Sequence, residues 1–148
     1  MSGQAPSSDH APAAQWISIV VLVIGAIMVL AGAVTYATVS STLSDQRITV
    51  SSDADCMADR PVNGPIAAYC EALAISHHVL NATDGKTYAE LDQDDPARET
   101  AMTGSFLQAS LYTSVVAFGV AFMAIGVGIV FILVGIAIHS LAGRVRTG

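Results

Sequence analysis

Two long apolar runs bracket the chain, and neither contains an Asp, Glu, Lys or Arg. They extend over residues 16–39 and 111–141. Apolar runs of 18 or more residues are typical of membrane-spanning helices, because the bilayer interior offers no water to backbone polar groups. The pattern therefore predicts an all-α membrane protein, in which a two-helix transmembrane hairpin carries a small, mainly helical domain formed by the connecting region, residues 40–110.

The connecting region has the polar and turn-forming residues of a small folded domain, and two helices are predicted in it. The first follows Pro65 and ends before Gly85, and its apolar positions recur at spacings of three, four and seven. These positions predict one buried stripe: Ile66, Tyr69, Cys70, Leu73, His77 and Leu80. The second helix begins where Asp95 offers an N-cap side chain before Pro96, and no later proline interrupts it before about Ala142. The second span is thus expected to continue outward as a stalk.

Short tails flank the two spans. Residues 1–15 are small, polar and proline-containing, which predicts a disordered tail, and residues 142–148 form a second tail. Two spans place both tails on one side of the membrane. Arg144 and Arg146 lie directly after the second span, whereas Arg47 lies on the opposite side, so the density of positive charge favours cytoplasmic tails. The expected location is the plasma membrane, with the connecting region extracytoplasmic.

A cleaved signal peptide is the alternative for the first run, with Ala31-Gly32-Ala33 as its cleavage site. Signal peptides carry positive charge ahead of an apolar core of about 7–15 residues. Residues 1–15 contain no Lys or Arg, and the first run is longer than such a core. A membrane span is therefore the preferred interpretation.

Composition and charge limit the class of partner. Hydrophobic residues make up 53% of the 148 residues, more than is usual in a soluble domain. The connecting region carries eleven Asp or Glu residues against four Lys or Arg residues. Such an acidic region argues against nucleic acid, whose phosphates need a basic surface, and against docking on an anionic membrane face. The expected partners are membrane lipid and other integral membrane subunits, with a homo-oligomer as an alternative.

Both cysteines of the chain, Cys56 and Cys70, lie in the connecting region with thirteen residues between them. In an oxidising compartment such a pair closes a disulfide, whereas two free thiols would be expected in the cytosol. A redox-active pair is usually closer, as Cys-x-x-Cys. We therefore predict a structural disulfide that pins an otherwise marginal small domain.

No constellation of side chains in the sequence predicts catalysis, a metal or a cofactor. His77 and His78 are adjacent, so their side chains leave a helix about 100° apart and cannot both ligate one ion. Glu71 lies two turns from His78. The run from Asp92 to Asp95 lacks the glycine turn and the distal glutamate of a calcium loop. We therefore expect a protein that is not an enzyme and has no catalytic, cofactor-binding or metal-binding residues.

Small residues recur inside the spans, where glycine lets helices approach closely. Three pairs of glycines, each seven residues apart, are predicted to pack helices: Gly25 with Gly32, Gly119 with Gly126, and Gly128 with Gly135. The two pairs in the second span point to helix faces about 180° apart. One face is thus expected to hold the first span, and the other a helix from a partner.

Three segments carry a family resemblance: DGKTYAEL at 84–91, DDPAR at 94–98 and SFLQASLYTSVVAFGVA at 105–121. With them, roughly residues 16–140 resemble small two-span membrane proteins of actinobacteria, often labelled aromatic ring-opening dioxygenase. The resemblance implies the two-span fold and an actinobacterial plasma membrane. The enzymatic label does not follow from the residues, because a non-haem iron site needs two histidines and a carboxylate that converge on the metal.

The expected function is that of a non-catalytic accessory subunit in a larger membrane complex, for which a respiratory complex is a natural host. Small-residue helix faces and the acidic outer domain would contact the other subunits. The alternative is a free-standing or homo-oligomeric membrane protein whose outer domain binds or senses a component of the cell envelope.

Overall fold

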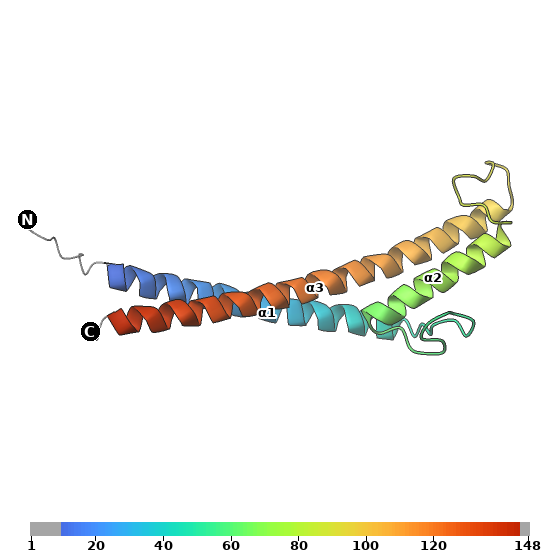
Figure 1. Ribbon diagram of the computed structural model, residues 1–148. Helices are drawn as coiled ribbons and strands as arrows, with labels where there is room; N and C mark the ends of the chain where they lie inside the picture. The colour runs from blue at the N-terminus through green and yellow to red at the C-terminus, as the bar shows by residue number, and fades with distance from the viewer. Residues whose placement is uncertain (1–9, 146–148) are drawn as a thin grey trace, which may run out of the picture. The chain divides into compact units, whose positions relative to one another are not determined.

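The computed structural model describes residues 10–145, which form three helices joined by irregular segments (Figure 1). Helix α1 extends over His10–Asp45, α2 over Pro65–Ala82 and α3 over Ala97–Val145. Within the described residues, the β-structure is limited to an isolated bridge between Thr49 and Pro61. The predicted all-helical class is therefore confirmed.

Helix α1 is longer than the predicted first span. It begins at His10, so residues 10–15 are helical where the sequence predicted disorder, and residues 1–9 of that predicted tail lie outside the described residues. Pro12 falls in the first turn, where a proline interrupts no intrahelical hydrogen bond. At the other end α1 continues to Asp45, because residues 33–45 contain neither proline nor glycine.

Helix α3 is continuous from Ala97 to Val145, as the sequence predicts. Its start is capped by Asp95, whose Oδ1 accepts a hydrogen bond of 2.9 Å from the backbone N–H of Ala97. Of the predicted second tail, residues 142–145 belong to the helix, and residues 146–148 lie outside the described part of the chain.

Two of the helices are long and apolar enough to cross a membrane, over Ala13–Asp45 in α1 and Ala97–Gly143 in α3. Only 17% of the most apolar stretch of each is buried within the chain. The outward-facing side chains of these stretches are therefore mostly large and apolar. This arrangement is compatible with a two-pass membrane protein.

The described residues fall into two compact units. The first joins residues 10–34 of α1 to residues 121–145 of α3. Its fully buried positions recur every seventh residue and are all small: Ser18, Gly25 and Gly32 on α1, and Ala121, Gly128, Gly135 and Ala142 on α3. A seven-residue repeat is the period of coiled-coil packing, and small side chains at the seam allow the two backbones to come close.

The second unit comprises residues 35–120 and contains the end of α1, all of α2 and the first half of α3. Its core combines Leu43, Val50, Val62, Leu111 and Phe118 with alanines of α2. The Phe118 ring is fully buried, and its centroid lies 5.0 Å from that of Tyr36. Aromatic contact of this kind adds to the stability that burial provides.

Helix α2 buries a different face from the one that the sequence predicts. Ile66, Tyr69 and Leu73 are exposed by 67%, 47% and 40%, and His77 is also exposed. The buried positions are mainly alanines: Ala67, Ala68, Cys70, Glu71, Ala72 and Ala74. Alanine side chains permit a closer approach of helix backbones than large apolar side chains do. The predicted stripe was therefore wrong except for Cys70, which is buried, and Leu80, which is partly buried.

The close approach is clearest between α2 and α3. A Cβ atom added to Gly104 would overlap the side chain of Val79.

Helix α2 ends in a turn that contains Gly85. The Gly85 N–H donates to the Leu80 carbonyl at 2.7 Å, and Gly85 has φ +80°, a conformation that favours glycine.

Candidate functional site

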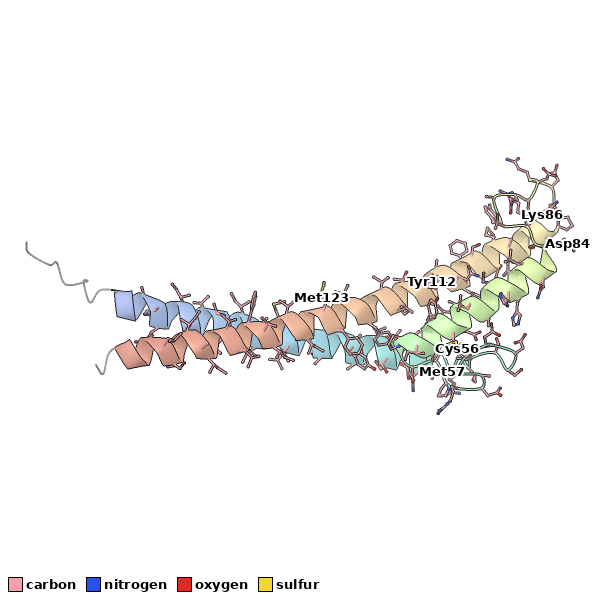
Figure 2. All side chains as sticks on the ribbon, in the orientation of Figure 1. Cys56, Met57, Asp84, Lys86, Tyr112 and Met123 are labelled. Carbon is pink, nitrogen blue, oxygen red and sulfur yellow. A yellow bond between two sulfur atoms is a disulfide. The ribbon has the colours of Figure 1, made fainter. Side chains whose placement is uncertain are left out.

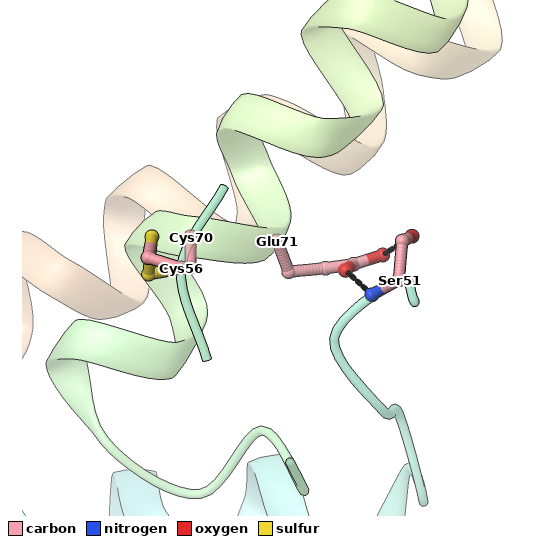
Figure 3. Close-up of a disulfide and its surroundings, with 4 residues drawn as sticks. All are labelled: Ser51, Cys56, Cys70 and Glu71. Carbon is pink, nitrogen blue, oxygen red and sulfur yellow. Dashed lines mark hydrogen bonds between the residues drawn. A yellow bond between two sulfur atoms is a disulfide. The ribbon is translucent and has the colours of Figure 1, made fainter. Parts of the chain in front are cut away.

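The connecting region is organised around the predicted disulfide, which joins Cys56 to Cys70 (Figure 3). Cys70 lies on the second turn of α2 and is 2% exposed, whereas Cys56 lies in the irregular segment that precedes α2. The Cys56 segment, defined as residues 51–59, is closed at its base by short backbone pairing. The Val50 N–H donates to the Arg60 carbonyl at 2.8 Å, and the Val62 N–H to the Ile48 carbonyl at 2.9 Å. The disulfide therefore fixes this excursion to α2.

Glu71 supplies a second attachment between α2 and the same segment. Its Oε2 accepts a 2.7 Å hydrogen bond from the Ser51 backbone N–H, and its Oε1 lies 3.3 Å from the Ser51 hydroxyl, which also donates to it (Figure 3). The Glu71 residue is only 7% exposed. A buried carboxylate is stable only when its oxygens are hydrogen-bonded, and these two bonds meet that need. No local pattern in the sequence indicates this contact, because Ser51 and Glu71 lie far apart along the chain.

Asp53 and His78 form a third attachment, on the surface. His78 Nε2 lies 2.7 Å from Asp53 Oδ2, and the two side chains remain 47% and 66% exposed. The hydrogen bond with His78 lowers the pKa of the Asp53 carboxyl from its ordinary value of 3.8, and the nearby charge of His77 acts in the same direction. The Cys56 segment is thus held to α2 by one covalent contact, one buried polar contact and one exposed hydrogen bond.

The disulfide and the Asp53–His78 contact border a hollow of about 130 Å³. Its wall includes the polar side chains of Asp53, Asp55, His77, His78 and Asn81. His77 is exposed, which corrects the expectation that the predicted stripe buries it. Among the residues that the structure describes, no three His, Cys, Asp or Glu side chains are grouped so that they could hold a metal ion. The hollow can therefore offer hydrogen bonds and charge to a small polar molecule.

A separate cluster ties the loop before α3 to that helix. The Arg98 guanidinium donates to the Leu91 carbonyl at 2.6 Å and lies 4.2 Å from the centroid of the Tyr88 ring. Glu90 Oε2 accepts hydrogen bonds of 2.8 Å from both the backbone N–H and the hydroxyl of Thr87, which lower the pKa of the Glu90 carboxyl. Thr87 and Glu90, three residues apart, thus stabilise a turn through these hydrogen bonds. The cluster brings together the segments 84–91 and 94–98.

The six glycines predicted to pack helices divide into two groups. Gly25 lies against Gly128 and Ile132, and Gly32 against Ala121 and Ile125. Gly135 contacts Leu22 and the backbone of Ser18. An added Cβ atom at any of these glycines would come within 2.9 Å of another residue.

Gly119 and Gly126 differ from this group, because an added Cβ atom at either would meet no atom of another described residue within 4 Å. The face of α3 that carries Gly128 and Gly135 is therefore the one that holds α1. The expectation that a partner helix covers Gly119 and Gly126 stays a prediction.

One polar contact inside the first unit was not expected from the sequence. Ser18 is fully buried, and its hydroxyl donates to the Gln15 carbonyl at 2.7 Å. The same oxygen lies 3.1 Å from Nδ1 of His139. Since the Ser18 proton is used by Gln15, the histidine nitrogen is the donor in this contact. His139 thus links the two helices near the ends of the apolar runs.

Comparison of the chain with protein-family models, with curated protein sequences and with solved structures finds no match in any of the three.

Proposed function

We propose that the chain spans a membrane twice and serves as a non-catalytic accessory subunit of a larger membrane complex. The insertion is supported by two helices whose most apolar stretches are only 17% buried. In water, exposed apolar surface costs about 25 cal/mol per Å², so two such helices are stable only when lipid or protein covers them. The acidic connecting region would lie outside the membrane.

The observation that carries the accessory role is the open space beside Gly119 and Gly126. A glycine that faces lipid gains no packing, and it is less favourable in a helix than alanine by about 1 kcal/mol. Four other glycines of the spans are each used in contact between α1 and α3, whereas a Cβ atom added to either of these two would meet open space among the described residues. A helix from another subunit, seated on this face of α3, would use the close approach that they permit.

A free-standing or homo-oligomeric protein is the second candidate function. The hollow beside the disulfide favours it, because Asp53, Asp55 and Asn81 offer polar groups that a component of the cell envelope could bind. Both candidates are non-catalytic. The disulfide uses both cysteines of the chain, which removes the thiol as a nucleophile.

The test is a native pull-down from the source membrane through a C-terminal tag, in mild detergent, with mass spectrometry of the eluate. Stoichiometric recovery of other integral membrane subunits is the result expected for an accessory subunit. Recovery of the protein alone, at the size of a monomer, would contradict this role. Recovery of an oligomer that contains only this protein would favour the second candidate.

A matched pair of variants directs the test to the open glycines. Gly119→Leu with Gly126→Leu should release the partner, since the larger side chains fill the space that a foreign helix would occupy. Val120→Leu with Val127→Leu is the control, because both valines are already exposed, by 52% and 39%, and neither is a small residue. Equal recovery of the partner from both variants would show that the glycine face is not the contact.

A further inference from the structure

The first turns of α2 expose apolar side chains that the described chain covers only in part. Ile66, Tyr69 and Leu73 follow one another at spacings of three and four, which places them on one side of the helix. They are exposed by 67%, 47% and 40%. We call these three residues the outer face of α2. The single charged residue in positions 65–76 is Glu71, and it is buried against Ser51.

Two contacts place this face at the level where the first apolar run ends and the second begins. The Ser40 hydroxyl donates to the Asn63 carbonyl at 2.7 Å, and Ser40 directly follows the first apolar run. The rings of Tyr69 and Tyr112 lie with centroids 6.2 Å apart, and Tyr112 is the second residue of the other apolar run. Helix α2 therefore starts beside the ends of both runs.

Helix α2 itself carries a single Asp or Glu, the buried Glu71. Asp84 lies in the loop at the opposite end of α2 from Tyr112 (Figure 2). The first turns, in contrast, present an apolar surface and two tyrosines. Tyrosine is enriched where one part of a side chain meets hydrocarbon and the other meets water.

We infer that the outer face of α2 rests in the headgroup layer of the lipid bilayer, on the side of the connecting region. This inference rests on the proposed membrane insertion and assigns α2 to the membrane surface. Residues 66 to 73 rise by about 10 Å along a helix. Because α2 starts beside the ends of both apolar runs, Ile66 is then the deepest residue and Leu73 the shallowest. The lipid involved is zwitterionic, because the connecting region as a whole is acidic.

The experiment measures the depth of single tryptophans. In a Trp16→Phe chain, tryptophan is placed in turn at Ile66, Tyr69, Leu73 and His77, and each full-length protein is reconstituted into phosphatidylcholine vesicles with brominated acyl chains. His77 is the matched control, because it is exposed on α2 and lies one turn beyond Leu73. Quenching of the tryptophan fluorescence by the brominated chains should decrease from position 66 to position 73. It should be severalfold stronger for the tryptophan at Ile66 than for the one at His77.

The unmodified chain separates failure of this inference from failure of the proposed insertion, because its single tryptophan, Trp16, lies at the other end of the first run. Quenching of Trp16 with none at Ile66 and Tyr69 would overturn the inference and leave the hairpin inserted. Blue-shifted emission at Ile66 without quenching would also overturn it, and would show that protein covers this face. No quenching at any position, Trp16 included, would overturn both proposals.

Discussion

Gly25 of α1 and Gly128 of α3 are reciprocal neighbours: a Cβ atom on either would lie 2.7 Å from the carbonyl oxygen of the other. Neither backbone can move away alone, because each helix is continuous through the contact. This relationship sets the distance between the two helices in the first unit.

Gly128→Ala should therefore destabilise the helix pair, by about 1–3 kcal/mol for overpacking at a site without free space. Gly126→Ala is the control, since it lies two residues away on the same helix and its added methyl meets open space. Unfolding in detergent, followed by circular dichroism as denaturant is added, measures both. Equal stability of the two variants would contradict the close contact.

The disulfide should limit the mobility of the Cys56 segment. Replacement of Cys56 and Cys70 by serine frees a closed loop of about fifteen residues, which corresponds to about 3 kcal/mol in the chain-entropy treatment. Limited proteolysis should then cut within residues 51–59 at a rate that the oxidised parent does not show. Identical digestion patterns for variant and parent would mean that other contacts hold the segment.

Glu71 should matter more to stability than its charge alone suggests. Glu71→Ala leaves the Ser51 N–H without its acceptor in a part-buried place, which costs about 1–3 kcal/mol. Glu71→Gln keeps an amide oxygen as acceptor and should cost less. Thermal unfolding of the three proteins measures the difference, and a Gln variant as unstable as the Ala variant would show that the bond to Ser51 is not what stabilises the site.

The sequence predicted the features that depend on neighbouring residues. The two long helices follow from uninterrupted apolar runs, and the start of α3 follows from Asp95 before a proline. Each of these needs only a few consecutive residues to be recognised. The disulfide was predictable as well, because Cys56 has Cys70 as its single possible partner in the chain.

The predictions from sequence were wrong or absent where the structure depends on which surface of a helix packs against another element. Periodicity placed Ile66, Tyr69 and Leu73 on one side of α2, but that side is exposed and the alanine side is buried. A helix with large residues on one face and small ones on the other can pack through either, and the neighbouring helix decides. The contacts of Glu71 with Ser51 and of His78 with Asp53 have no local signal, since twenty and twenty-five residues separate the partners. The glycine pairs of α3 share one spacing, so spacing alone could not assign α1 to the face of Gly128.

The Asp53–His78 contact should be visible in the titration of Asp53. Because the pKa of this carboxyl is lowered below its ordinary value of 3.8, its contribution to stability is present above that value and is lost as the pH falls through the lowered pKa. His78→Ala removes the hydrogen-bond donor and should raise the pKa of Asp53 back toward 3.8. Carboxyl chemical shifts in an NMR titration measure it, with Asp55 in the same protein as internal reference. An unchanged pKa in the variant would mean that the two side chains are not paired in solution.

The packing of α2 on α3 can be tested through Gly104 and Val79. An added methyl at Gly104 would overlap the Val79 side chain, and β-branched valine cannot turn its methyl groups away easily. Gly104→Ala should therefore lower the stability of the second unit, although alanine is the better helix former. Val79→Ala removes the atoms that clash, so the same glycine substitution in that background should cost less or become favourable.

Thermal unfolding of the parent, both single variants and the double variant gives the coupling between the two positions, which should be about 0.5–3 kcal/mol for residues in direct contact. Additive effects would place the two side chains apart, and α2 would then pack on α3 in a different register.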